Sequence, residues 1–162
     1  MAIHIFNDLC TTMNIEIQPF IGYGQIKFGQ SLEQVKLLLG EPTDSTREKH
    51  DDGTEDVSLL YGELGVELSF MSEDDFRLGL ISCYAPIYSL DGIAYTGMSE
   101  EEFLATAKYP DLKLEDDFTD LKAKDYTIDS KGLSIWIQDG FVKSVTLFPK
   151  YVGDSEEIEW PV

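Results

Sequence analysis

The chain has 162 residues, of which 43% are hydrophobic and 12% aromatic, a composition that favours one folded core over disorder. Its 31 acidic and 12 basic residues give a formal net charge of −19, which repels nucleic acid and anionic membranes as partners. The same charge would attract a basic protein, or it would serve only to keep the chain soluble.

The first residues carry no sign of export. Residues 1–6 lack a basic start, and Asn7 and Asp8 interrupt any apolar run, so no signal peptide is predicted. No segment approaches the ~20 apolar residues of a membrane helix. Cys10 and Cys83 form no CxxC motif and are too few for a disulfide framework. We therefore expect a cytoplasmic protein with free thiols. A Cys10–Cys83 bond remains the alternative if the protein is exported.

The N-terminal part predicts two extended pieces and a helix. Residues 13–18 alternate apolar and polar, which predicts a half-buried strand, and residues 20–28 form a second extended piece. Ser31 is the expected N-cap of a helix over residues 32–39, and Gln34 completes a capping box. Gly40 is expected to end this helix.

The helix start recurs later in the chain. Counted from Gly29 and from Gly97, both copies read G-x-S-x-E-x-[V/F], then six residues, then proline. In the second copy Ser99 is the expected cap, Glu102 closes the box, and Lys108 lies in the last turn. The shared signals predict one supersecondary unit used twice.

The segments after the two helices also match each other. A polar stretch, residues 43–56 or 111–125, precedes two predicted strands joined by a turn. The strands are expected over residues 64–70 and 77–86 in the first copy, and over 131–137 and 140–149 in the second.

These elements predict an α+β fold, in which two tandem helix-plus-antiparallel-sheet repeats form one compact unit. The expected divisions are an N-terminal strand segment over residues 1–21, a first repeat over 22–88, a second repeat over 89–150 and an acidic C-terminal tail over 151–162.

Alternation along the strands sorts the two faces of the sheet. The face under the helices is expected to carry Val66, Leu68, Phe70, Leu133, Ile135 and Ile137. Trp136 and Glu67 then point to the other face, and we expect Tyr84 and Phe148 beside them. The alternative is that the tail, through Ile158 and Trp160, covers this face and buries its rings.

A family resemblance bears on the architecture. Residues 22–42 read as an extended segment, the helix start G-x-S-x-E-x-V and then L-G-x-P. This pattern resembles the repeat unit of beta-lactamase inhibitor proteins, and of small bacterial lipoproteins of the outer-membrane barrel-assembly machinery. The resemblance implies tandem units whose helices pack on one face of an antiparallel sheet, and a second face that binds protein. The export signal and cysteine pairs of these relatives are missing, so inhibition of beta-lactamase is not implied.

No motif predicts catalysis, a metal site or a cofactor. Neither His4 nor His50 has a Ser or Cys motif beside it. Residues 48–53 end like a calcium loop, but Leu59 stands where the bidentate Glu is required. The acidic runs 73–75 and 115–117 are typical of surface charge. We therefore predict no catalytic residues.

The sequence favours an acidic protein-binding module, most concretely an immunity or inhibitor protein that neutralises a basic bacterial toxin or enzyme. Such a module could be a monomer or a homodimer. One alternative is a small self-associating structural or assembly protein, and another is a carboxylate-based hydrolase or metal-binding protein. The predicted contact residues are the rings Trp136, Tyr84 and Phe148 and the acids Glu67, Asp74, Asp75, Asp116 and Asp117.

Overall fold

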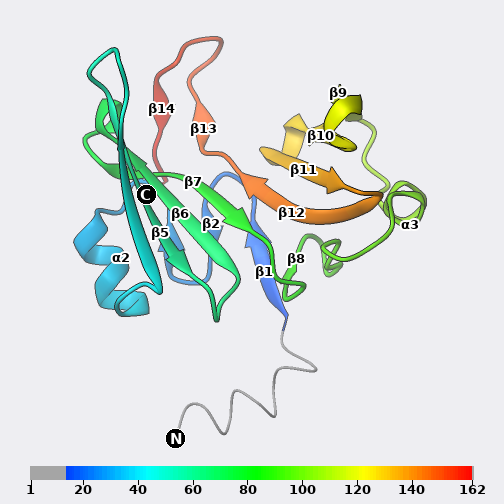
Figure 1. Cartoon of the computed structure of the whole chain (residues 1–162), viewed down its shortest axis with the longest axis horizontal. Coiled ribbons are helices and arrows are strands. Elements are labelled where there is room, and N and C mark those ends of the chain that lie inside the picture. Colours follow the sequence, from blue (N-terminus) through cyan, green and yellow to red (C-terminus); the bar gives the residue numbers. More distant parts are fainter. Residues whose placement is uncertain (1–13, 162) are drawn as a thin grey trace, which may run out of the picture.

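An eight-stranded antiparallel sheet dominates the computed structural model, which describes residues 14–161 (Figure 1). Its strand order is β4-β5-β6-β7-β12-β11-β10-β9. The first four strands are β4 (Asp44–Lys49), β5 (Glu55–Tyr61), β6 (Val66–Met71) and β7 (Arg77–Cys83). The other four are β9 (Leu112–Phe118), β10 (Ala123–Ile128), β11 (Leu133–Gln138) and β12 (Phe141–Leu147).

The sheet consists of two four-stranded meanders that meet at β7 and β12, which lie side by side in Figure 1. Three residue pairs join them: Cys83 with Val145, Ser82 with Thr146, and Ile81 with Leu147. The helix α2 (Leu32–Leu39) precedes the first meander, and α3 (Glu100–Thr106) precedes the second. Short 3-10 turns, η1 (Ser72–Asp74), η2 (Thr119–Leu121) and η3 (Asp129–Lys131), connect neighbouring strands. Helices and mainly antiparallel sheets make this an α+β fold, as predicted.

A second, smaller sheet contributes to the core. Its order is β3-β2-β1-β8, with bounds Ile26–Lys27, Gly22–Tyr23, Ile15–Gln18 and Tyr88–Ser89. The predicted strand over residues 13–18 is therefore confirmed for its described part, and it pairs in parallel with β8. Tyr23 and Tyr88 pack edge to face with ring centroids 5.2 Å apart, in the same buried cluster as Cys83.

One face of the large sheet is apolar and buried. Val66, Leu68 and Phe70 on β6 are fully buried, and the three alternate residues of β11 are at most 3% exposed. This confirms the predicted inner face. Val35 of α2 and Phe103 of α3, both fully buried, belong to the same core. Each such aliphatic or aromatic side chain stabilises the fold by roughly 1.5–3 kcal/mol relative to exposure.

The predicted capping is confirmed in full for α2 and in part for α3. The Ser31 hydroxyl accepts a bond from the Gln34 N–H at 3.1 Å, and the Gln34 side chain accepts one from the Ser31 N–H at 2.9 Å. Ser99 also caps α3 through the Glu102 N–H at 3.1 Å, but α3 shows no return bond from Glu102. The helix ends at Thr106, because the backbone of Ala107 is already extended, so Lys108 lies beyond the last turn and not within it as predicted.

The polar stretches before the predicted strands are strands themselves. β4 and β9 form the two edges of the sheet, and β5 and β10 begin within the same polar stretches. β4 is exposed along its whole length. An edge strand is held by backbone hydrogen bonds to one neighbour, so it requires no apolar alternation. The ion pair of Arg47 with Glu55, at 3.0 Å, adds a cross-strand contact.

Several sequence expectations concern residues outside the described range. His4 and Cys10 lie there, whereas Cys83 is buried in β7, where burial raises the pKa of its thiol. Within residues 14–161, no helix is both long enough and apolar enough to cross a bilayer.

We expect Ser31→Ala and Ser99→Ala each to lower the free energy of unfolding by about 1 kcal/mol, because each hydroxyl accepts a bond from a first-turn N–H. Gln34→Ala should also destabilise the protein, whereas Glu102→Ala removes no return bond and should cost less. Urea unfolding followed by circular dichroism measures all four variants. Equal losses for Gln34→Ala and Glu102→Ala would contradict the capping geometry.

Candidate functional site

The face of the large sheet opposite the helices, here called the open face, is polar in its middle. Glu67 pairs with Ser82, Ser82 with Thr146, and Thr146 with Ser134, so one row of side chains crosses four strands. Glu67 is exposed, as predicted, and the other three are partly buried. Partners in register point to the same face. This row therefore separates the two ends of the open face.

Aromatic rings gather on the open face of the second meander. Trp136 of β11 packs on Phe118 of β9 with ring centroids 5.7 Å apart, and Phe118 is 39% exposed. Phe141, which pairs with Gln138 two positions beyond Trp136, is 50% exposed. We call Phe118, Trp136 and Phe141 the aromatic strip. Tyr84, 38% exposed, directly follows β7.

Carboxylates lie beside the strip. Asp125 of β10 pairs with Trp136 on one side and with Asp116 on the other, so all three share the open face. Neither aspartate takes part in an ion pair within residues 14–161. Partial burial, and then the charges of Asp116 and Glu115, raise the pKa of Asp125. The strip is therefore bordered by negative charge that no cation of the described chain balances.

One lysine, Lys143, lies close to these carboxylates and partly offsets their negative charge. The register of β11 and β12 slips between Trp136 and Ile137, and Lys143 is the extra, exposed residue at this bulge. Lys113 lies 3.3 Å from Glu115 and 3.4 Å from Asp129, so its charge is already engaged. Lys143 has no ion-pair partner among the described side chains. It lowers the negative potential at the strip without removing it.

The predicted contact residues do not all meet. The structure brings Trp136, Tyr84, Glu67 and Asp116 to the open face, and Phe148 is half buried just after β12. Asp74 and Asp75 lie instead at the η1 turn between β6 and β7. Phe118, Phe141 and Asp125 were not predicted. Only the pairing register, which brings them beside Trp136, identifies them.

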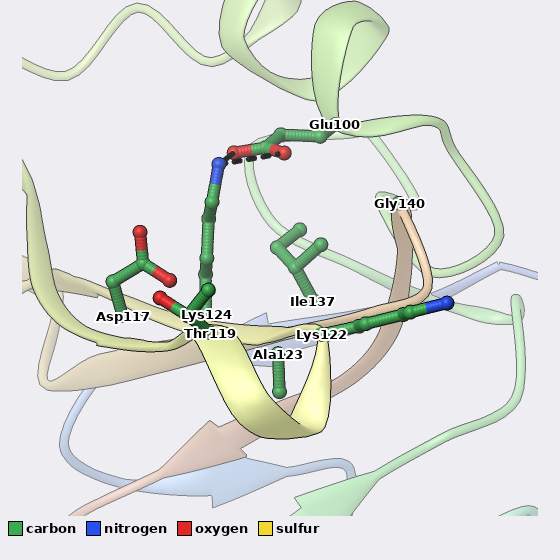
Figure 2. Close-up of a pocket in the computed structure, with 8 residues that line it drawn as sticks. All are labelled: Glu100, Asp117, Thr119, Lys122, Ala123, Lys124, Ile137 and Gly140. Carbon is green, nitrogen blue, oxygen red and sulfur yellow. Dashed lines mark hydrogen bonds and ion pairs between the residues drawn. The ribbon is translucent and has the colours of Figure 1, made fainter.

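Asp117 lies on the other side of the sheet. A bulge in β9 beside Asp125 shifts the alternation, so Asp117 pairs with Lys124 and faces α3. Figure 2 shows Lys124 and Ile137 on the same side as Glu100, in a hollow of about 320 Å³. Asp116 and Asp117, which were predicted as contact residues of one surface, therefore lie on opposite faces of the sheet.

Two of the charges that line this hollow, those of Lys124 and Glu100, are paired with each other. Lys124 Nζ lies 2.9 Å from Glu100, and the Tyr126 hydroxyl donates to Glu100 at 2.6 Å. The bond from Tyr126, and then Lys124, lower the pKa of Glu100, while burial and this carboxylate raise the pKa of Tyr126 to about 12. The network ties α3 to β10. We therefore assign it a structural role.

The C-terminal tail covers part of the open face, at the first meander. Its strands β13 (Lys150–Tyr151) and β14 (Ile158–Glu159) form a hairpin, seen in orange and red in Figure 1. Tyr151 and Ile158 line a hollow with Met71 and Asp74. The Arg77 guanidinium lies 4.5 Å from the ring centroid of Trp160. The tail therefore docks beside η1, and the aromatic strip belongs to the other half of the sheet.

No protein-family model, curated protein or solved structure matches this chain. Within the described residues, no group of three or more His, Cys, Asp or Glu is arranged to hold a metal ion. Any function must therefore be inferred from the geometry and the charges of the open face.

We expect Asp125→Asn to raise the midpoint of thermal unfolding at pH 7. The raised pKa of Asp125 means that folding disfavours its charged form, so a neutral amide relieves desolvation and repulsion. The gain should shrink as the pH falls through the folded-state pKa, because the wild-type carboxyl then takes up its proton. Differential scanning calorimetry across this range measures it.

Asp120→Asn, at the exposed η2 turn, controls for the general repulsion of a chain with net charge −19. An equal rise in both variants at every pH would show that Asp125 has no special environment.

Proposed function

We propose that this chain is an acidic protein-binding module that captures a basic protein on its open face, as an immunity or inhibitor protein captures a toxin or enzyme. One observation carries the proposal: the half-exposed aromatic strip stands beside Asp116 and Asp125, whose charges are unbalanced within the described chain. Aromatic anchors bordered by charge are typical of binding surfaces.

The strip and its carboxylates lower the stability of the free chain. Phe118 and Phe141 leave large apolar areas in water although the core buries other rings fully. Asp125 is held where burial and like charges oppose its ionisation. A basic partner would remove both penalties, because it would cover the rings and place cations beside the carboxylates. The net charge of −19 would also steer such a partner toward the module.

We propose further that the two halves are copies of one helix-plus-meander unit. Equivalent backbone bonds support this. In the first half the Gly29 N–H donates to Leu78 at 2.9 Å and the Leu78 N–H donates to Gln30 at 2.8 Å. In the second half Gly97 donates to Val142, and Val142 to Met98, both at 2.8 Å. Such an architecture agrees with the tandem inhibitors that the sequence resembles.

Self-association is the second candidate. The outer edge of β9 pairs with no described strand, and Leu114 on it is 47% exposed. Two copies joined at this edge would bring their Glu115, Asp116 and Asp117 side chains together, which opposes pairing at low salt. We therefore rank it below capture of a basic partner.

We expect Trp136→Ala to abolish partner capture and to leave folding nearly intact. Tagged protein is used to pull basic proteins from a lysate of the source cells at low and at high salt, and mass spectrometry identifies what is retained. Steering by charge predicts more retention at low salt. Leu37→Ala is the matched control, because Leu37 is 86% exposed but lies on α2, away from the open face.

Retention of one basic protein, lost in Trp136→Ala and kept in Leu37→Ala, would support the proposal. Recovery of nothing, or of the chain alone, would contradict it. Equal loss in both variants would place the contact elsewhere.

A further inference from the structure

Each half of the open face has a position beside the glycine that precedes its helix, and the side chains around these two positions differ. In the first half, a Cβ added to Gly29 would lie 3.2 Å from the indole of Trp160, which also stacks on the guanidinium of Arg77. The equivalent positions in the second half are Gly97 and Phe141. Gly97 bonds Val142 as Gly29 bonds Leu78, and Ser99 forms a β-bridge with Phe141 as Ser31 does with Arg77. The tail thus occupies one of two related positions.

Within residues 14–161, the second position has no such cover. A Cβ on Gly97 would meet nothing within 4 Å, although its φ of +98° is close to the +94° of Gly29. Phe141, in the place of Arg77, is half exposed. In the first half a cation of the sheet meets an aromatic ring of the tail. In the second half the sheet supplies the rings, and no described cation lies over any of them.

The charges around the second position favour a cation. Asp125 pairs with Trp136 in the register and Asp116 pairs with Asp125, and neither carboxylate has an ion-pair partner among the described residues. Arginine stacks on aromatic rings and pairs with carboxylates at the same time, and it is more weakly hydrated than lysine. Lys143 is the only described lysine at the Trp136 bulge, and it opposes a second cation.

We infer that the aromatic strip is an arginine-binding surface, on which a guanidinium of the basic partner stacks while Asp125 and Asp116 hold its charge. This inference rests on the proposed function, since it names the side chain that the open face recognises. The cation–ring pair of Arg77 and Trp160 is then the same contact made within the chain, with its two partners exchanged.

A capped tetra-arginine peptide is the probe, and a tetra-lysine peptide is the comparison. The chain has two tryptophans, so Trp160→Phe leaves Trp136 as the only indole, and its fluorescence reports binding at the strip. We expect tetra-arginine to change this fluorescence and to bind several-fold more tightly than tetra-lysine. Calorimetry on the unmodified chain checks that the Trp160→Phe change itself does not alter the affinity.

Three variants locate the contact by calorimetry. We expect Asp125→Asn and Phe141→Ala each to weaken tetra-arginine binding about fivefold, and Lys143→Gln to strengthen it about twofold. Glu33→Gln is the matched control, because it removes an exposed carboxylate on α2, on the other side of the sheet. Since Asp125→Asn is expected to stabilise the fold, a loss of binding there cannot come from unfolding.

Equal weakening in Asp125→Asn and Glu33→Gln would mean that the peptide responds only to net charge, and would overturn the inference. So would equal affinity for both peptides with unchanged Trp136 fluorescence. Failure here is separable from failure of the proposed function. If a basic protein is captured through Trp136 but its binding is insensitive to Asp125→Asn and Phe141→Ala, the proposed function stands and the arginine contact is refuted.

Discussion

The pairing of β7 with β12 is the constraint on which the rest of the structure depends. Only three residue pairs join the two meanders, and Cys83 lies fully buried among them. Beyond these pairs, β7 and β12 no longer bond to each other. Leu78 of β7 bonds instead to the segment before α2, and Val142 of β12 bonds to the segment before α3. One central contact therefore fixes the relative position of both meanders and both helix starts. It also makes a single open face out of two short ones.

The different roles of the two faces result from this arrangement. Helices and the small sheet bury the apolar face, whereas within residues 14–161 the other face is covered only in part, by the tail. The tail closes the η1 end of that face with Trp160, while Phe118 and Phe141 leave the opposite end half exposed. The two ends of the open face thus differ, because the tail covers one end and the rings at the other end stay half exposed within residues 14–161. In the function proposed above, the carboxylates of Asp125 and Asp116 would give this end its preference for a cation.

Features that depend on neighbouring residues, such as helix ends and the buried face of a strand, could be predicted from the sequence. Ser31, Gln34 and Gly40 fix the first helix to the residue, and alternation identifies the inner face of β6 and β11. The edge strands β4 and β9 were missed because an exposed strand has no apolar period. The site was harder still, since the neighbours of Trp136 come from β9, β10 and β12 and depend on register. Alternation alone puts the adjacent Asp116 and Asp117 on opposite faces, and a bulge in β9, which no local pattern predicts, makes Asp117 the one on the far side.

Hydroxyl-radical footprinting of the free chain, read by mass spectrometry, would show whether the tail closes one end of the open face and leaves the aromatic strip accessible. We predict rapid oxidation of Phe118, Phe141 and Tyr84, and protection of core rings such as Phe70 and Phe103. Protection of Phe118 and Phe141 to the level of Phe70 would refute an accessible strip, because the rings would then be covered by the chain itself or by a second copy.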